Sequence, residues 1–290
     1  MTDGPLTVRE RLARHYADLT PTERRLADAL MDDYPNAGLA SITVVAQRAK
    51  VSTTTVVRMV HKLGIRGFPQ FHDALLQELQ AQVAGPAERR EKWVSAAPDS
   101  HMINRFAQAV TQNLEQTFAH LDTESFDRAA RILANQEHRL FVVGGRMTKA
   151  LADYAFTHFQ AIRPRVTYLT ASSATWAHYV LDMTPGDVLL IFDVRRYETN
   201  LERLAELASE RGVILILITD QWASPVAKVS EYVFNCWVEI PSAWDSNSST
   251  MMLLEALIAS TQDARWPETR ERFEALDRLF DQTRLFRKGP

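Results

Sequence analysis

Two different hydrophobic patterns divide the chain. Through residues 1–80 apolar positions recur at helical spacing and no strand pattern is visible, which predicts an all-α domain. Later, short and uniformly apolar runs alternate with helix-like segments, as expected for strands buried on both faces of a parallel sheet. The chain is therefore expected to fold as an all-α domain followed by an α/β doubly wound parallel-sheet domain. The expected strands lie at residues 140–145, 166–170, 188–193, 214–219 and 232–236.

The segment between the two patterns is expected to be a linker. It contains a Gly-Pro pair, a charged cluster and a second proline, a composition typical of loops or of a loosely packed helix. The expected organisation is a first domain over 1–80, a linker over 81–100 and a second domain over 101–290. Within the second domain, one helical stretch is expected over 102–134 and two terminal helices are expected over 246–286, separated near Trp266.

Composition narrows the function without identifying it. A net charge of −3 argues against a protein that coats nucleic acid over its whole surface, but residues 34–72 contain no Asp or Glu and several Lys and Arg. The single cysteine, Cys236, excludes an internal disulfide, and we expect no metal and no cofactor. No apolar run is long enough for a membrane helix and the first residues do not resemble a secretory signal, so we expect no membrane partner and a cytoplasmic location.

Residues 42–64 fit two short helices joined by a tight turn. Val45, Ala49 and Val56 have the spacing of an interhelical contact, and Ser52 is the expected N-cap of the second helix. The outward face is rich in hydroxyl and basic groups, which suits the major groove of DNA. The alternative is a small helical bundle with a solvated polar face. The residues expected to contact DNA are Ser52, Thr53, Thr54, Thr55, Arg58, His61, Lys62 and Arg66.

Residues 19–75 resemble the N-terminal domain of RpiR-type transcriptional regulators, including the sequence VVR before a KLG-x-x-GF turn. The resemblance implies a helix-turn-helix domain that binds a double-stranded DNA operator. One departure from the family pattern is Lys50, which stands in the turn where glycine is usual.

Residues 125–265 resemble the sugar isomerase (SIS) domain that follows the linker in the same family. The matching pieces are FVVGG before a helix, PGDVLLIF, and ITD with a following SP. The resemblance implies a flavodoxin-like strand order, in which the loops after the first and third strands face each other at the switch point. We therefore expect a ligand site between residues 144–148 and 193–199.

The two loops depart from the pattern of a phosphosugar site. Arg195, Arg196 and Tyr197 stand where a Ser-x-Ser-Gly-x-Thr loop is usual, and Arg146 replaces a glycine, whereas Thr148 matches a phosphate-binding serine of the family. Several guanidinium groups near a helix N-terminus favour a small anionic effector, such as a phosphosugar or a sugar acid. Alternatively, an arginine fills the space of a lost ligand and pairs with Asp193, Glu198 or Asp220. The expected ligand residues are Gly145, Arg146, Thr148, Arg195, Arg196, Tyr197, Thr199 and Asp220.

No motif specifies an enzyme. Glu198, His178 and Glu255 are the candidates for an isomerase base, but none lies in a catalytic motif, so we expect a regulator without catalytic residues. A phosphosugar isomerase with an accessory helical domain is the alternative, and a scaffold that does not bind DNA is a third possibility. The resemblance and the apolar segment 251–259 together favour a homodimer or homotetramer.

Overall fold

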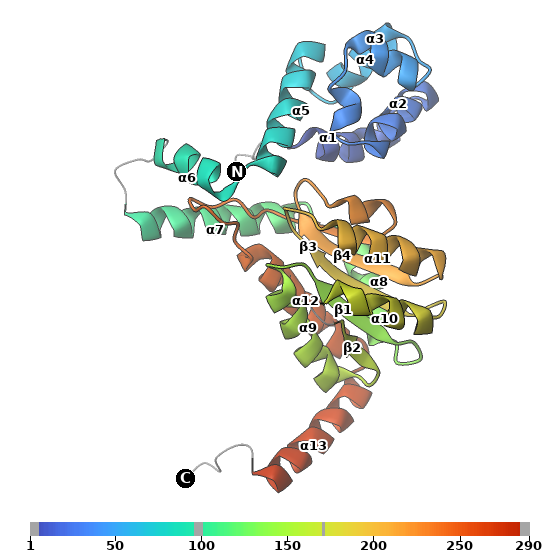
Figure 1. The fold of residues 1–290 in the computed structure, drawn as a ribbon, viewed down its shortest axis with the longest axis vertical. Helices are drawn as coiled ribbons and strands as arrows, with labels where there is room; N and C mark the ends of the chain where they lie inside the picture. Colours follow the sequence, from blue (N-terminus) through green and yellow to red (C-terminus); the bar gives the residue numbers. More distant parts are fainter. Residues whose placement is uncertain (1–5, 96–100, 170–171, 285–290) are drawn as a thin grey trace. The chain divides into compact units, whose positions relative to one another are not determined.

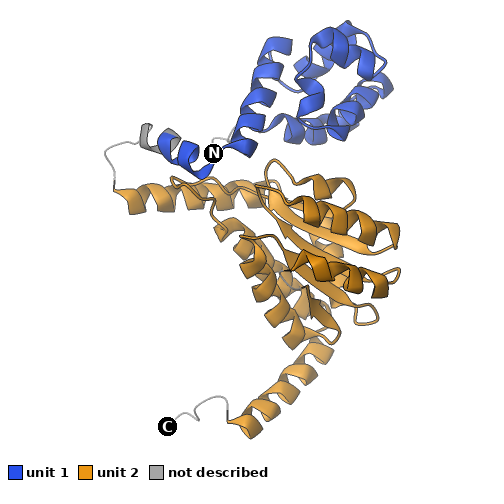
Figure 2. Ribbon diagram, viewed as in Figure 1, with its two compact units in different colours: residues 1–97 blue, residues 98–290 orange. Residues whose placement is uncertain are grey.

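The computed structural model describes residues 6–95, 101–169 and 172–284 (Figure 1). The chain divides into two compact units, residues 1–97 and residues 98–290 (Figure 2). Part of the segment expected to be a linker forms a helix, and its last residues, 96–100, lie outside the described residues. The linker boundaries therefore remain a prediction.

The first unit is entirely helical in its described residues, as the sequence predicts. Two of its helices begin with a capping box, in which Thr7 pairs with Glu10 and Thr20 pairs with Glu23, so orphan backbone N–H groups are satisfied. The elements are α1 (Val8–His15), η1 (Tyr16–Asp18), α2 (Pro21–Asp32), η2 (Asn36–Gly38), α3 (Ile42–Arg48), α4 (Thr53–Lys62), α5 (Phe68–Val83) and α6 (Pro86–Ser95).

The helix-turn-helix is formed by α3 and α4. Ser52 is the N-cap of α4, as predicted, and its hydroxyl accepts a hydrogen bond of 3.1 Å from the N–H of Thr55. Lys50 adopts a left-handed conformation with φ of 53°, which explains why glycine is usual at this turn. Val56 and Met59 are fully buried, so the apolar side of α4 packs into the helical core.

The second unit is built on a five-stranded parallel sheet of order β2-β1-β3-β4-β5, as predicted from the flavodoxin-like resemblance. Its strands are β1 (Leu140–Gly144), β2 (Val166–Tyr168), β3 (Val188–Asp193), β4 (Ile214–Asp220) and β5 (Tyr232–Cys236). Its helices are α7 (Met102–Ala119), α8 (Thr123–Ala134), α9 (Lys149–Ile162), η3 (Ser173–Thr175), α10 (Trp176–Asp182), α11 (Thr199–Glu210), η4 (Pro225–Lys228), α12 (Ser248–Ala264) and α13 (Trp266–Thr283).

Helices cover both faces of this sheet (Figure 1). Alternate strand residues such as Phe141 and Leu189 pack with Leu201 of α11 and Val180 of α10 on one face. Helices α8, α9 and α12 pack together on the other face. Every residue of β3 is buried, which is why the strand reads as a continuous apolar run in the sequence.

One expectation about the helices was wrong in detail, and the apolar segment 251–259 has a use within the chain. The stretch 102–134 is two helices, because the carboxylate of Asp122 accepts a hydrogen bond from the N–H of Glu124 and starts α8. The apolar segment 251–259 contributes Leu253, Leu254, Leu257 and Ile258 to the core of its own unit. Burial within one chain accounts for this apolar run, so it no longer argues for a dimer.

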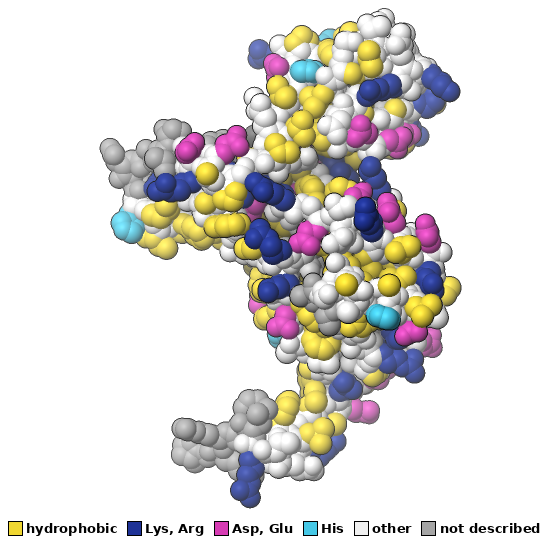
Figure 3. Space-filling model, viewed as in Figure 1, with side chains coloured by type: hydrophobic (Ala, Val, Ile, Leu, Met, Phe, Trp, Pro, Cys, Tyr) yellow, Lys and Arg dark blue, Asp and Glu magenta, His cyan; other side chains and the backbone are white. Residues whose placement is uncertain are grey.

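The visible surface of the α/β unit carries basic and acidic side chains interspersed (Figure 3). This mixture agrees with the small net charge of −3 and with a discrete binding site rather than a large basic face. Among the described helices, none combines the length and the apolar character needed to cross a bilayer.

The end of β1 lies against the start of α9 so closely that Gly144 is required there. A Cβ added at Gly144 would lie 2.6 Å from the carbonyl oxygen of Thr148. We expect Gly144→Ala to lower the free energy of unfolding by about 1–3 kcal/mol, because backbone must move. Urea unfolding followed by tryptophan fluorescence measures this, since five of the six tryptophans belong to the second unit.

Gly145→Ala is the matched control for this prediction. A Cβ there would lie 2.9 Å from Oε1 of Glu198, at the end of a flexible side chain that can move. Equal losses of stability in the two variants would contradict the close backbone approach at Gly144.

Candidate functional sites

The outward face of α4 carries most of the residues that the sequence assigns to DNA. Ser52, Thr53, Thr54, Arg58 and His61 are exposed. Their hydroxyl, guanidinium and imidazole groups therefore lie at the surface of the first unit, on the side of α4 opposite its buried apolar residues. Arg66, in the turn that follows α4, is also exposed.

The expected position of Thr55 is wrong. Thr55 is 6% exposed, and its hydroxyl lies 2.9 Å from the hydroxyl of Ser52. Thr55 lies one turn before Met59 and next to Val56, so helical spacing places it at the edge of the buried side of α4. Thr55 therefore supports the cap of the helix instead of facing outward.

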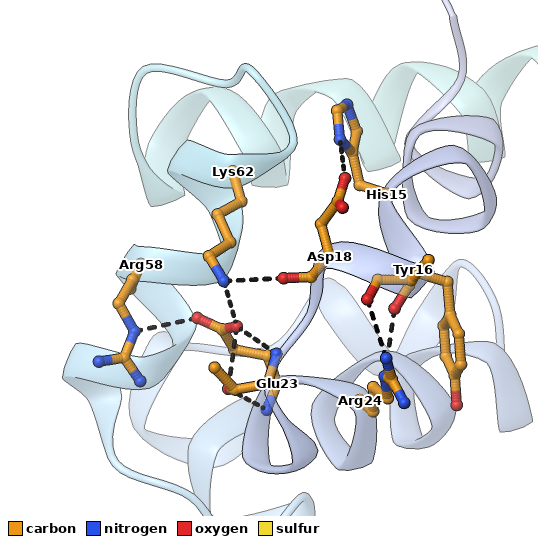
Figure 4. A network of polar contacts seen from close by, with 9 residues as sticks. His15, Tyr16, Asp18, Glu23, Arg24, Arg58 and Lys62 are labelled. Carbon is orange, nitrogen blue, oxygen red and sulfur yellow. Dashed lines mark hydrogen bonds and ion pairs between the residues drawn. The ribbon is translucent and has the colours of Figure 1, made fainter.

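A buried carboxylate lies beside α4 and was not identified from the sequence. Glu23 of α2 is fully buried, and its Oε1 accepts a hydrogen bond of 2.9 Å from Nε of Arg58 (Figure 4). Its Oε2 accepts one of 2.8 Å from Nζ of Lys62. Lys62 also donates to the carbonyl oxygen of Asp18, at 3.1 Å. Two residues expected to contact DNA are thus paired inside the domain.

Glu23 is ionised in this environment. Burial opposes the charged form, but hydrogen bonds from Lys62, Thr20 and Arg58 outweigh it and lower the pKa of Glu23 to about 2. The carboxylate therefore keeps its negative charge at any pH near neutrality. The capping box with Thr20 is the signal in the sequence that places Glu23 in a first helical turn, but the spacing gives no hint of its partners on α4.

The switch point of the second unit lies between β1 and β3, as the resemblance implies. Gly144 pairs with Phe192 in the sheet, and the N–H of Gly145 donates to the carbonyl oxygen of Phe192 at 3.2 Å. The loops 144–148 and 193–199 therefore start side by side at the carboxyl edge of the sheet.

Thr148 joins the two strands at this edge. Its hydroxyl donates to the carbonyl oxygen of Phe192 at 2.6 Å and accepts the N–H of Gly145 at 2.9 Å. The side chain is only 3% exposed. The hydroxyl that the resemblance assigns to a phosphate is thus committed to the protein itself.

Arg195 is a buried ion-pair residue, and the pairing differs from the expected one. Its Nε and Nη2 donate to the two carboxylate oxygens of Asp245 at 3.0 and 2.6 Å, and Nη2 lies 3.5 Å from Glu239. Its guanidinium lies 4.0 Å from the ring centre of Trp222. Of the acids expected as partners, Asp193, Glu198 and Asp220, none holds the guanidinium. A bidentate contact with the carboxylate of Asp245 and the ring of Trp222 satisfy the guanidinium instead.

Tyr197 and Asp220 form a second internal pair. The hydroxyl of Tyr197 donates to Oδ1 of Asp220 at 2.7 Å, and the backbone N–H groups of Arg195 and Trp222 donate to the same carboxylate at 2.7 and 3.0 Å. Asp220 is completely buried, and burial raises the pKa of its carboxyl. These contacts fix the path of the loop after β3 against the end of β4.

Few of the predicted ligand residues in the two loops after β1 and β3 are exposed. Arg146, Arg196 and Thr199 are exposed, whereas Gly145 is buried. The carboxylate of Glu198 accepts a hydrogen bond from the backbone N–H of Arg146 and packs on Gly145. The carboxylate of Glu198 therefore accepts the backbone N–H of Arg146 at the place where the sequence predicts an anionic ligand.

The three candidates for an isomerase base do not meet. His178 is exposed on α10, and Glu255 is exposed on α12, where it accepts a hydrogen bond of 3.0 Å from the hydroxyl of Tyr154. Helices α10 and α12 cover opposite faces of the sheet. Glu198 alone lies at the switch point, so these residues form no acid-base pair around a common substrate position.

Asp193, at the end of β3, gives the second unit a pH dependence. Burial raises the pKa of Asp193 from 3.8 to about 7, and the charge of Asp220 adds to this effect, although a hydrogen bond from Ser224 opposes it. Because the folded-state pKa lies above the unfolded one, the folded state holds more protons between pH 4 and 7. Stability is therefore expected to fall as pH rises through this range.

We expect Asp193→Asn to reduce this dependence, because the amide cannot ionise, and the buried Asp220, whose pKa is also raised, to supply the remainder. Urea unfolding at pH 5 and pH 8, followed by tryptophan fluorescence, measures the difference for the wild type and the variant. Ser224→Ala is the control that loses the hydrogen bond but keeps the titrating carboxyl. A wild type whose second unit is more stable at pH 8 than at pH 5 would contradict the assignment.

Comparisons with known proteins agree with both units. The family model described as a helix-turn-helix domain of the rpiR family matches residues 6–82, and the SIS domain model matches residues 132–260. The chain is 25% identical over 230 residues to an uncharacterized HTH-type transcriptional regulator of Thermotoga maritima, covering 79% of this chain and 80% of that protein. It is 26% identical over 219 residues to the HTH-type transcriptional regulator HexR of Escherichia coli, covering 76% and 74%.

The fold is shared along the whole chain with a solved structure. The NanR protein of Vibrio vulnificus, solved in complex with ManNAc-6P, superposes with a TM-score of 0.55 at 17% identity, covering 95% of this chain and 98% of that one. With its rpiR-type helix-turn-helix domain followed by a SIS domain, the chain belongs to the RpiR family of transcriptional regulators.

Proposed function

We propose that this protein regulates transcription by binding a double-stranded DNA operator through α4, and that its SIS domain binds a small anionic effector that modulates this binding. The observation that carries the proposal is the exposed polar face of α4, set on a capped helix-turn-helix whose other face is buried. An N-terminal turn rich in hydroxyls suits close approach to base edges and phosphates in the major groove.

We assign contacts with base edges and contacts with phosphates to different residues. Arg58 projects from the middle of α4 and is the residue suited to a base edge, whereas Arg48, Lys50 and Arg66 are exposed at the ends of the motif and suit phosphates. Because no acidic residue lies between positions 34 and 72, nothing within this stretch repels the DNA backbone.

The effector site is proposed for the crevice between the loops after β1 and β3. Arg146, Arg196 and Thr199 are the exposed side chains there, and the backbone N–H of Arg146 becomes a donor to the ligand when the carboxylate of Glu198 is displaced. Guanidinium groups next to backbone N–H groups favour a phosphate or carboxylate. Since the related fold of NanR was solved with ManNAc-6P, phosphosugars are the first class to test. Arg195, Thr148 and Tyr197 then shape the loops and do not touch the effector.

Regulation requires that effector binding change the fit to DNA. We propose a homodimer or homotetramer whose paired helix-turn-helix domains bind two half-sites, with the effector shifting the population between arrangements of these domains. A cytoplasmic location agrees with this role. In such a protein the ligand serves to control DNA binding without being converted to a product, and we propose no catalytic activity.

DNA binding is tested by electrophoretic mobility shift with genomic fragments over a range of salt concentrations. The wild type is expected to form a salt-sensitive and sequence-dependent complex. Arg58→Ala is expected to cost about 1–3 kcal/mol and to relax sequence preference, because a base contact is lost. Arg66→Ala is expected to weaken all sequences alike and to reduce the salt slope by about one.

Arg128→Ala is the control for this experiment, since Arg128 is an exposed arginine of α8 paired with Glu124. Wild-type affinity and preference in a folded Arg58→Ala protein would refute the base contact. A wild type that binds no fragment in a salt-sensitive way would refute the proposed function as a DNA-binding regulator.

Effector binding is tested by thermal-shift screening of sugar phosphates, sugar acids and inorganic phosphate. A ligand at a hundredfold excess over its dissociation constant is expected to stabilise the protein by about 2.7 kcal/mol. Arg146→Ala and Arg196→Ala are expected to weaken binding, because each loses a guanidinium. Glu198→Gln is expected to strengthen it, since a competing carboxylate is removed from the amide of Arg146.

Arg270→Ala on α13 is the matched control, because Arg270 is exposed and pairs with Glu274 one turn away. The proposed site would be wrong if neutral compounds were the sole stabilising ligands. It would also be wrong if both crevice variants bound an anionic hit as tightly as the wild type.

A further inference from the structure

The contact between Glu23 and Arg58 determines which edge of the arginine can meet DNA. Glu23 binds Nε of Arg58, on one side of the guanidinium. Neither Nη1 nor Nη2 of Arg58 forms a hydrogen bond with another described residue, and the side chain is 57% exposed. The terminal edge, with its two Nη groups, is therefore the edge presented to solvent. Two parallel N–H donors are the arrangement that pairs with O6 and N7 of guanine.

The partner of Arg58 is held more firmly than the arginine itself. Glu23 is fully buried, and besides Arg58 its carboxylate binds Lys62 at 2.8 Å and the N–H and hydroxyl of Thr20 at 2.8 and 2.9 Å (Figure 4). These bonds keep the pKa of Glu23 at about 2, so the acceptor is charged at neutral pH. An exposed arginine anchored on such a group loses less side-chain freedom when it binds a base.

The same carboxylate affects how Arg58 chooses between the two kinds of group that DNA offers, the anionic phosphates and the neutral base edges. A lone guanidinium on this face could bind any phosphate within reach, and such contacts carry no base information. With Glu23 attached, part of the positive charge of Arg58 is already compensated, which weakens its attraction to phosphate. Hydrogen bonds from the Nη groups to guanine remain available because they depend on donor geometry.

Lys62 is predicted to contact DNA, and in the structure it also has internal partners. Its ammonium group binds Glu23 and the backbone of Asp18, and its side chain is 34% exposed. It supplies the second positive charge that allows a buried carboxylate to remain ionised beside Arg58. Lys62 therefore stabilises the anchor and does not need to contact a phosphate.

We propose that Glu23 is a specificity-determining residue of the DNA-binding domain, which positions Arg58 for guanine and keeps it from phosphates. This inference rests on the proposed DNA-binding function. Glu23 acts through Arg58 and does not touch DNA, so it is a positioning residue. Removing its charge should then change sequence preference and salt dependence, two properties that a purely structural cap would leave alone.

The test begins with selection of preferred sequences from a randomised DNA duplex library by the wild-type full-length protein. Affinities are then measured for the preferred duplex and for duplexes in which each guanine pair is replaced by an adenine pair. For Glu23→Gln, the preference at one guanine position is expected to fall at least about fivefold, while affinity for unrelated duplexes is kept or increased. The salt slope is expected to steepen by about one, because Arg58 then binds a phosphate.

A double-mutant cycle separates action through Arg58 from other effects. In the Arg58→Ala background, Glu23→Gln is expected to cause no further loss of preference, because the group that it positions is absent. Glu23→Asp serves as a second variant if the glutamine variant unfolds. It keeps the charge in the first turn of α2 but is too short by one methylene to hold Arg58 in place, so it is expected to lose preference as well.

Thr7→Val is the matched control for loss of a cap. It removes the hydroxyl of the capping box at the start of α1, where Thr7 pairs with Glu10, and leaves the contacts of Glu23 in place. It is expected to lower the melting temperature and to keep the wild-type preference and salt slope. Folded Glu23 variants with the sequence preference and salt slope of the wild type would overturn this inference and leave the proposed DNA-binding function standing. A wild type that selects no sequence would overturn it together with the proposed function.

Discussion

The second unit depends on a parallel sheet that is buried on both faces. A strand such as β3 has no position at which a polar side chain can reach water, because helices cover both sides of it. Polar groups can therefore gather only where the strands end. The strand order β2-β1-β3-β4-β5 brings the ends of β1 and β3 side by side, and the meeting of their two loops at this edge follows from the topology rather than from any single residue.

Charged and polar groups that are buried together at one edge of the sheet need hydrogen-bond and ion-pair partners, and other residues of the chain supply them. Asp193 and Asp220 are both buried there, and burial raises the pKa of each. Ser224 and Tyr197 donate to these carboxyls, and Asp245 reaches in from the loop after β5 to hold Arg195. Arg195 depends on such partners, since a buried guanidinium needs a carboxylate and hydrogen bonds.

Local patterns predicted the parts of this structure that depend on neighbours along the chain. Ser52 was identifiable as a cap because its partner, Thr55, is three residues away, and central strands such as β3 were visible because their burial is continuous. Pairs that are distant in sequence were not identifiable. Glu23 lies 35 residues from Arg58, and Arg195 lies 50 residues from Asp245, so no periodicity links them. Thr55 was misplaced because its hydroxyl was assigned to the surface, although the residue lies one turn before the buried Met59 on the same side of α4.

Both units share one electrostatic arrangement, in which the chain supplies its own anion where an external one is expected. Glu23 binds Arg58 on α4, and Glu198 binds the amide of Arg146 in the crevice. At the proposed effector site, an incoming anion must displace Glu198 from the backbone N–H of Arg146. On α4, Glu23 stays bound to Nε of Arg58 while the Nη groups meet a base edge. In both cases the positive group is already partly compensated before the ligand arrives, so binding depends strongly on the geometry of the incoming group. An internal carboxylate therefore favours selectivity over affinity, which is the property that a regulator needs among many competing phosphates.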